Sequence, residues 1–281
     1  LLDSAHSQNS SVEKVIEYNK KVKLLYTEGK HQEAFELAKE TLKFVEKTFG
    51  PNHPYIFIPC NALGTFYKNL GDYAASEYYF ERALNIYDKH FGPQAIETEP
   101  ILSEMGDLYR LQKKYKKSLT FLNRSVEIIE TNKGPESERM IAPLNNLAIL
   151  FRDMKEYSLE KKVYARLIPL IEKHEKMDVS YAVVLHNYSD LCFAEKEYAK
   201  AEIILLNALS ILYKLGLKNH PESAVVKTKL ARSAEQRGEY SLAEKYYVES
   251  FIFHASFYGY KHFKTRMDYD NLLTFYQGLG R

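Results

Sequence analysis

The chain has 281 residues, and 45% of them are hydrophobic, which is enough for a continuous core. Its 39 Lys and Arg residues nearly balance its 37 Asp and Glu residues, which argues against a dedicated nucleic-acid binder. The sequence contains no run of about 18 apolar residues, so it predicts no membrane span.

In chain order, the first segment is polar and rich in Ser, and residues 1–11 are therefore predicted to be a flexible lead-in. Residues 12–281 are predicted to form one domain of paired helices. The predicted repeats cover residues of about 15–56, 57–98, 99–140, 141–181, 182–223 and 224–265, followed by a terminal helix at 266–281. The chain begins with Leu1 rather than Met, so we expect that upstream sequence is missing.

A repeat of nearly constant length supports this division. Equivalent positions are His31, Tyr73, Tyr115, Tyr157, Tyr198 and Tyr240, and the steps between them are 42, 42, 42, 41 and 42 residues. A small residue stands nine positions earlier in most repeats, for example at Gly64 and Gly106. A fixed period of this size indicates a solenoid, in which each repeat buries its apolar face against its neighbours.

The second repeat shows how one unit is built. Apolar residues in the range 63–70 are spaced by three and four positions, as on one face of a helix, and the same spacing returns in the range 79–87. Gly71-Asp72 separates the two halves, so the unit is a helix A, a tight turn and a helix B. Small residues such as Gly64 should let the two helix backbones approach closely.

These residues resemble a known family. The positions Leu63-Gly64, Tyr67, Gly71, Tyr73, Phe80 and Ala83-Leu84 resemble a tetratricopeptide repeat (TPR). The longer unit resembles the kinesin light chain type, with its closest matches at Phe49-Gly50-Pro51-Asn52-His53-Pro54 and Leu144-Asn145-Asn146-Leu147-Ala148. The predicted fold is therefore all-α, a right-handed α-solenoid of about six TPR helix pairs plus a terminal helix.

Several conspicuous residues have structural interpretations. Glycines at 50, 92, 134 and 259 share one register and are expected to end each helix B in a left-handed conformation. Asn52-His53-Pro54 and Asn219-His220-Pro221 are interpreted as turns that start the next helix, rather than as ligand-binding histidines. Cys60 and Cys192 lie three repeats apart on apolar helix faces and are expected to be buried free thiols.

The sequence shows no catalytic constellation. It contains no phosphate loop, no Gly-x-Ser-x-Gly, no His-Glu-x-x-His and no Cys-x-x-Cys. Its nine histidines form no i, i+4 pair suited to a metal. We therefore expect no enzyme activity, no metal and no cofactor in this chain.

The candidate site follows from solenoid geometry. In stacked pairs the A helices line the concave surface, so the A-helix positions that face away from helix B point into a groove. The predicted partner-binding residues are Asn19, Lys23, Asn61, Lys68, Arg110, Asn145, Asn146, Arg152, His186, Asn187, Lys229 and Arg232. Asn side chains can hold a peptide backbone by donor and acceptor, and Arg and Lys suit carboxylates. An ordinary hydrated inner face is the alternative.

The resemblance to kinesin light chains implies a groove that binds short acidic peptides containing aromatic residues, with the best match at Asn145, Asn146 and Arg152. The predicted function is that of a scaffold or adaptor, which binds an extended peptide or partner segment in the concave groove. We expect this partner segment to carry acidic groups. Two alternatives are a peptide-sensing regulatory TPR protein and the recognition domain of a larger enzyme. No nucleic-acid partner is expected, and the predicted compartment is the cytoplasm.

Overall fold

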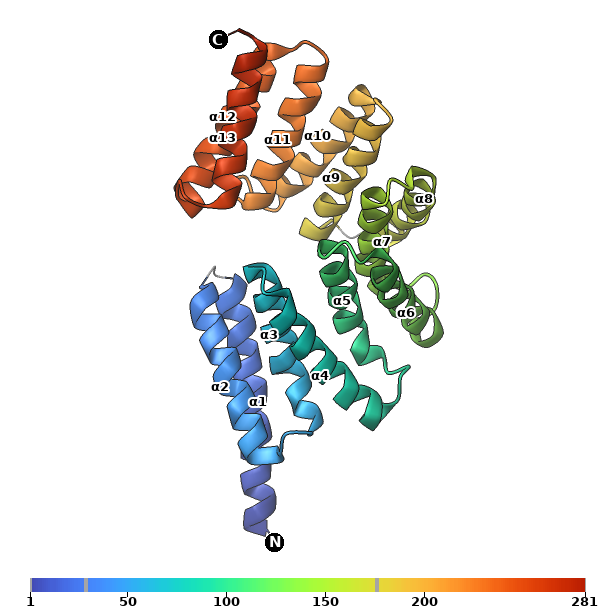
Figure 1. The fold of residues 1–281 in the computed structure, drawn as a ribbon, viewed down its shortest axis with the longest axis vertical. Helices are drawn as coiled ribbons and strands as arrows, with labels where there is room; N and C mark the ends of the chain where they lie inside the picture. The colour runs from blue at the N-terminus through green and yellow to red at the C-terminus, as the bar shows by residue number, and fades with distance from the viewer. Residues whose placement is uncertain (1, 28–29, 175–176, 281) are drawn as a thin grey trace. The chain divides into compact units, whose positions relative to one another are not determined.

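The structure, a computed structural model, describes residues 2–27, 30–174 and 177–280, and every regular element in these ranges is helical (Figure 1). The α-helices are α1 (Leu2–Thr27), α2 (His31–Phe49), α3 (Phe57–Leu70), α4 (Tyr73–Phe91), α5 (Glu99–Leu111), α6 (Tyr115–Lys133), α7 (Ile141–Asp153), α8 (Tyr157–Lys173), α9 (Val179–Ala194), α10 (Tyr198–Lys214), α11 (Pro221–Gln236), α12 (Tyr240–Tyr258) and α13 (Phe263–Gly278). Short 3-10 helices, Pro54–Ile56, Ile96–Thr98 and Glu138–Met140, precede α3, α5 and α7. The prediction of an all-α fold of paired helices is confirmed.

The chain divides into two compact units. Unit 1 extends to Met154 and contains α1–α7, and unit 2 starts at Lys155 and contains α8–α13. Odd-numbered helices up to α7 are the A helices of unit 1, and α9, α11 and α13 are the A helices of unit 2. Within each unit an A helix packs against the B helix that follows it, and that B helix packs against the next A helix.

The close approach predicted at Gly64 is present. A Cβ atom added to Gly64 would lie 2.5 Å from two carbons of the Phe80 ring on α4, so any larger residue would collide with that ring. The hydroxyl of Ser76 donates a 2.8 Å hydrogen bond to the Gly64 carbonyl, which ties the two helices together at the same level. Gly106 and Leu122 repeat the arrangement between α5 and α6, again with 2.5 Å for the added Cβ.

The turns between helices A and B require a left-handed residue. Gly71 occupies this position with φ 81° and ψ 4°, and Gly238 has φ 79°. Lys113, Lys155 and Lys196 occupy the same position with φ of 59° to 62°. An L-residue in this region is strained, so the packing of the helix pairs imposes the turn even where the sequence lacks glycine.

The glycines that end the B helices adopt a different conformation from the one expected. Gly50 has φ 96° and ψ 160°, and Gly92, Gly134 and Gly259 are close to these values. The positive φ agrees with the predicted need for glycine, but the chain leaves the helix in an extended direction rather than in the left-handed helical well. This region of φ and ψ is essentially restricted to glycine.

Residues 2–11 belong to the first helix. Helix α1 begins at Leu2, so residues 2–11, expected to be a flexible lead-in, are helical. The range up to Thr27 contains no Gly or Pro that would end a helix, which is the physical reason why the helix extends through it.

The histidine turns and the cysteines have the predicted structural roles. His53 and His220 are helix caps, because each Nδ1 accepts a hydrogen bond from a backbone N–H two residues later, at 3.2 and 3.1 Å. His262 caps α13 in the same way at 3.3 Å, a third case that the sequence motif did not include because no proline follows it. Cys60 and Cys192 are buried free thiols, and burial raises their pKa to about 12 and about 11.

Candidate functional site

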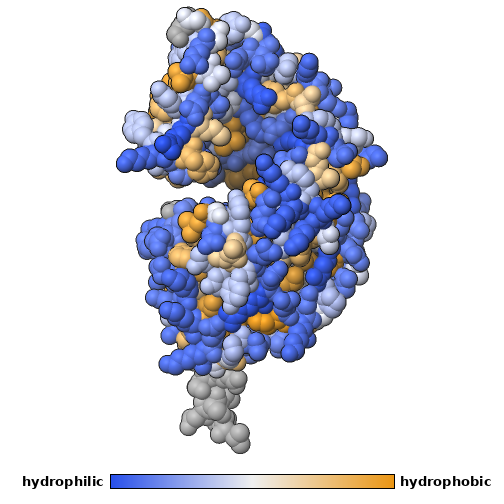
Figure 2. Space-filling view, viewed as in Figure 1, coloured by the Kyte–Doolittle hydropathy of each residue, from blue (hydrophilic) through white to orange (hydrophobic). Residues whose placement is uncertain are grey.

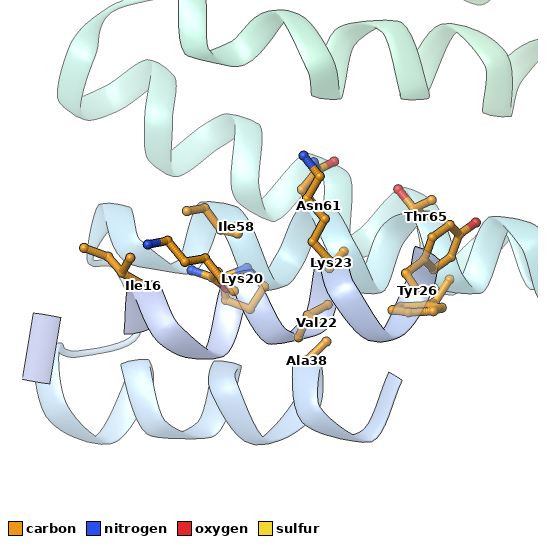
Figure 3. A pocket seen from close by; sticks show the side chains of 13 residues that line it. Ile16, Lys20, Val22, Lys23, Tyr26, Ala38, Ile58, Asn61 and Thr65 are labelled. Atoms are coloured by element: carbon orange, nitrogen blue, oxygen red, sulfur yellow. The ribbon is translucent and has the colours of Figure 1, made fainter. Parts of the chain in front are cut away.

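A groove lies between the first two A helices of unit 1 (Figure 3). Helices α1 and α3 form its walls, Ala38 on α2 closes part of its base, and its volume is about 470 Å³. We call this space the α1–α3 groove. Its lining residues are Ile16, Asn19, Lys20, Val22, Lys23, Tyr26, Ala38, Ile58, Pro59, Asn61, Ala62, Thr65 and Phe66. Three of the predicted binding residues, Asn19, Lys23 and Asn61, are therefore brought together in one place.

The groove is mainly apolar. Val22, Ala38 and Phe66 are buried at its base, whereas Ile16 and Ile58 are about half exposed on its two walls. Ile16 and Ile58 occupy the same position in successive repeats, fifteen residues before His31 and Tyr73. The sequence analysis missed both, because apolar residues at helical spacing are normally core residues, and only this shared register could have identified them.

Two side-chain amides in the groove lack partners. Asn19 Nδ2 on α1 and Asn61 Oδ1 on α3 are buried and form no hydrogen bond with any residue that the structure describes. Leaving a buried polar atom without a partner costs about 1–3 kcal/mol. One atom is a donor and the other an acceptor, so together they complement the C=O and N–H groups of a peptide backbone, which reaches them only when the side chains that cover them move aside.

Two lysines at the groove are not neutralised by neighbouring carboxylates. Lys20 and Lys23 are exposed on α1, and neither forms an ion pair within the described residues. Lys20 lies near Ile16 and Ile58 and Lys23 near Asn61 in the close-up view (Figure 3). Both ammonium groups are therefore available to an acidic ligand group.

The other predicted cations of unit 1 already have partners. Lys68 Nζ on α3 lies 2.7 Å from Glu104 and 2.6 Å from Asp107 on α5. Arg110 lies 2.8 Å from Asp107 and 2.7 Å from Asp153. Burial lowers the pKa of Lys68, but the two carboxylates outweigh burial and raise it overall. Burial raises the pKa of Asp107, but Lys68 and Arg110 outweigh burial and lower it overall.

The α7 residues lie apart from the α1–α3 groove. Asn145, Asn146 and Arg152 are half-buried on α7 and do not line it. Asn145 and Arg152 already interact with other groups of the protein. The positions that match the kinesin light chain type best are therefore not part of the α1–α3 groove.

The predicted residues of unit 2 also interact within the unit. His186 Nδ1 on α9 pairs with Glu222 on α11. Burial raises the pKa of Glu222, but the hydrogen bond with His186 and the nearby positive charges outweigh burial, so the pKa of Glu222 is lowered overall. Lys229 Nζ lies 2.8 Å from Asp190 and 3.0 Å from the His186 carbonyl. The Arg232 guanidinium lies 4.8 Å from the centre of the Phe193 ring.

Asn187 completes the predicted set and is buried on α9. The structure thus places the predicted residues at separate sites, and the α1–α3 groove combines apolar walls with polar atoms that have no hydrogen-bond partner among the described residues. Among the described residues, no group of three His, Cys, Asp or Glu side chains is placed to hold a metal ion. None of the helices described combines the length and apolar character needed to cross a membrane.

Comparison with known proteins identifies the repeat. A model of the tetratricopeptide repeat family matches residues 17–95, 97–173 and 180–251. Among solved structures, BtubC (BKLC) from P. vanneervenii is 17% identical, with 90% of this chain and 93% of that chain covered and a TM-score of 0.61. The predicted resemblance to tetratricopeptide repeats of the kinesin light chain type is confirmed.

Two other solved structures show the same fold. A Rap protein complexed with Competence and Sporulation Factor is 13% identical, with 94% of this chain and 87% of that chain covered and a TM-score of 0.62. A STAND ATPase with a tetratricopeptide repeat sensor from Pyrococcus horikoshii is 15% identical, with 84% and 34% covered and a TM-score of 0.65. No sequence among the curated proteins matches this chain.

Proposed function

The chain belongs to the tetratricopeptide repeat family, and from this premise we propose that it is a protein-interaction scaffold whose α1–α3 groove binds an extended segment of a protein partner. The proposal assigns no catalytic step to the chain. It concerns unit 1 alone, because all residues that line the groove belong to α1, α2 and α3.

The observation that carries the proposal is the pair of unsatisfied amides. Asn19 and Asn61 stand twelve residues before His31 and Tyr73, so they occupy the same position on neighbouring A helices. A bound peptide unit that accepts from Asn19 Nδ2 and donates to Asn61 Oδ1 would satisfy both buried atoms. The free protein lacks these two hydrogen bonds, so the binding of a backbone segment recovers them.

The apolar walls select a side chain of the partner segment. Ile16 and Ile58 flank the groove from opposite helices, and covering them with an aliphatic or aromatic side chain removes apolar surface from water. This gain is about 25 cal/mol for each Å² buried. We therefore expect one apolar anchor residue beside the peptide unit that the amides hold.

Lys20 and Lys23 give the charge preference. They are the unpaired cations at the groove, whereas Lys68 is held by Glu104 and Asp107. An acidic residue of the partner is therefore expected beside the apolar anchor rather than along α3 and α5.

The amide contribution is tested with the variant Asn61→Leu, which keeps the number and branching of the side-chain heavy atoms and has no polar atom. Removing an unsatisfied buried oxygen should raise the free energy of unfolding by about 1 kcal/mol. Affinity for peptides selected on the wild type from a random library should fall by at least about tenfold, because their backbone N–H loses its acceptor. Urea denaturation and fluorescence anisotropy measure the two effects.

A matched control separates this result from a general effect of losing an amide. Asn132 on α6 already donates to the carbonyls of Ile128 and Gln94, at 2.9 and 3.1 Å. Asn132→Leu should therefore destabilise the protein and leave peptide affinity unchanged. Peptides that bind Asn61→Leu as tightly as the wild type would place the binding site elsewhere.

The charge preference has its own control on α1. Lys23→Glu should weaken binding of acidic peptides, whereas Lys21→Glu, which changes an exposed lysine outside the groove, should not. Equal losses for both variants would indicate attraction by net charge rather than a contact in the groove.

A further inference from the structure

Two stretches of unit 2 contain no acidic residue. Residues 203–221 and 250–267 include neither Asp nor Glu, although the chain has 37 of them among 281 residues. The first stretch covers most of α10 and the loop to α11, and the second covers the end of α12, the loop to α13 and the start of α13. Both loops connect a B helix to the next A helix.

These two loops lie at the same end of the helix pairs of unit 2 (Figure 1). Lys218 and Asn219, in the first loop, border a hollow together with Ile252 and Ser256 of α12, so the first loop adjoins the second stretch. We define the loop edge of unit 2 as residues 213–220 and 256–267.

The loop edge exposes large apolar side chains. Tyr260, at the tip of the loop between α12 and α13, is 75% exposed, and Phe263 is 66% exposed. Leu215, Phe257 and Met267 are also exposed. Apolar and hydrophilic side chains are mixed on the lower end of unit 2 in the space-filling view (Figure 2). Contiguous exposed apolar side chains often mark an interaction site, so this exposed aromatic set points to a function.

The same edge carries exposed cations. Lys214, Lys218, Lys261 and Arg266 form no ion pair within the described part of the chain. A fifth cation, Lys264, is half-buried and lies 5.6 Å from the centre of the Tyr258 ring.

The carboxylates nearest the edge do not cancel this charge. Glu222 pairs with His186, Glu249 pairs with Lys227 at 2.7 Å, and Asp268 is buried against His254. Asp270, which borders a hollow with Arg266, is the exposed carboxylate on the first turns of α13. The exposed groups of the loop edge are therefore aromatic, aliphatic and positive.

We propose that the loop edge of unit 2 docks on an anionic lipid surface. Aromatic side chains such as Tyr260 and Phe263 favour the interface between headgroups and acyl chains, and the lysines attract anionic headgroups. Leu215 and Met267 have no ring on which a nucleobase could stack, so the edge fits a lipid surface better than single-stranded RNA. The contact is peripheral and uses residues of unit 2 alone.

Unit 1 provides the internal comparison. Two of its corresponding loops contain carboxylates, Glu97 before α5 and Glu136 and Glu138 before α7, whereas the loop before α3, residues 50–56, contains none. Phe91 at the end of α4 is 56% exposed, nearly the same as Phe257 at 55%. An exposed aromatic residue near an exposed lysine is therefore common to both units, since Lys89 forms no ion pair within the described residues. Unit 2 differs because Phe257, Tyr260 and Phe263 gather with several such cations at one edge.

Flotation of the full chain with vesicles tests the proposal. We expect binding to phosphatidylcholine vesicles that contain phosphatidylserine, and little binding to pure phosphatidylcholine. The double variant Lys218→Glu, Lys261→Glu should bind roughly 30-fold more weakly, since each cation near the surface contributes about a fivefold change. The double variant Phe257→Ser, Phe263→Ser should also lose binding, while its circular dichroism spectrum stays that of the folded protein.

The matched control, Lys89→Glu with Phe91→Ser in unit 1, should bind vesicles like the wild type. Equal loss in this control would overturn the proposal, and so would the absence of binding to phosphatidylserine vesicles or binding to homopolymeric RNA in their place. Asn61→Leu should retain vesicle binding, so a failure of peptide binding and a failure of lipid binding are distinguished.

Discussion

One position of the repeat has different roles in the two units. It lies twelve residues before the turn marker, and it is Asn19 and Asn61 on α1 and α3 but Thr228 on α11. The two asparagine amides have unpaired buried atoms, whereas the Thr228 hydroxyl lies 2.8 Å from the hydroxyl of Ser250 and donates to Asp268 at 3.2 Å. The same register therefore has unpaired buried atoms on α1 and α3 of unit 1, whereas on α11 of unit 2 it holds three helices together.

The equivalent position on α5, also in unit 1, resembles Thr228. The Ser103 hydroxyl donates to Glu99 at 3.0 Å and lies 3.1 Å from the Ser125 hydroxyl, so it too is satisfied within the protein. The difference teaches that a polar residue at this position stays unpaired only where no neighbouring helix supplies its partner.

The largest expected effect comes from removing the buried carboxylate of unit 2. Asp268 accepts from Ser250 at 2.7 Å and pairs with His254 at 2.7 Å, and the Asp268 and His254 side chains are only 2% and 1% exposed. Asp268→Ala should lower the free energy of unfolding by about 3–5 kcal/mol, because it leaves a buried partner without compensation. Urea denaturation measures the change.

The control for this prediction is on the same helix. Asp270 is exposed, so Asp270→Ala should change stability by no more than about 0.5 kcal/mol. A small effect of Asp268→Ala would mean that the buried network does not hold α13 to α11 and α12, and the contrast with unit 1 would disappear.

A packing variant of intermediate effect tests the spacing of α3 and α4 beside the groove. Gly64→Leu should cost about 1–3 kcal/mol, because the added side chain meets the Phe80 ring. Thermal melting measures the loss. Adding Phe80→Ala should recover part of the stability, and an unchanged melting temperature of the single variant would contradict the close approach.

Asn61→Leu, which should stabilise the protein by about 1 kcal/mol while weakening peptide binding at least about tenfold, sharpens the comparison most directly. The matching variant in unit 2, Thr228→Val, should destabilise instead, since it removes the partner of Ser250 and Asp268. We therefore expect the two variants to change the free energy of unfolding in opposite directions, because Asn61 has an unpaired buried atom and Thr228 has hydrogen-bond partners.

The smallest expected effect concerns the histidine caps that both units share. Burial, followed by neighbouring positive groups, lowers the pKa of His53 and His262 from the ordinary value of 6.5. The neutral histidine caps therefore contribute their full stability above a pH of about 6.5, the pKa of histidine in the unfolded chain. This contribution is lost as the pH falls through the lower pKa values that the two histidines have in the folded protein. Stability measured from pH 7.5 to 5 should decline by a few tenths of a kcal/mol per cap.

Asparagine caps without titrating, so the double variant His53→Asn, His262→Asn should show a smaller decline over this pH range. The same pH dependence in wild type and variant would show that other groups cause it.

Much of the fold could be predicted from the sequence, and the site only in part. Asn19, Lys23 and Asn61 were predicted as binding residues, and the structure brings them into one groove. Lys68 and Arg110 carried the same sequence signal, but carboxylates of neighbouring repeats neutralise them. Side-chain partners that lie on a different helix cannot be read from the local pattern.

The sequence by itself determined the repeat, the helix pairs and the chemistry of their turns. Three features can be recognised directly in the sequence, because each acts within a few residues or one repeat. They are apolar spacings of three and four residues, small residues at Gly64 and Gly106, and glycine where φ is positive. The tertiary structure decided which polar groups are satisfied, because the pairing residues are about one repeat apart, as Lys68 and Asp107 are. Whether a polar side chain at a given repeat position is hydrogen-bonded within the protein or stays unpaired depends on the residue that the neighbouring repeat places beside it.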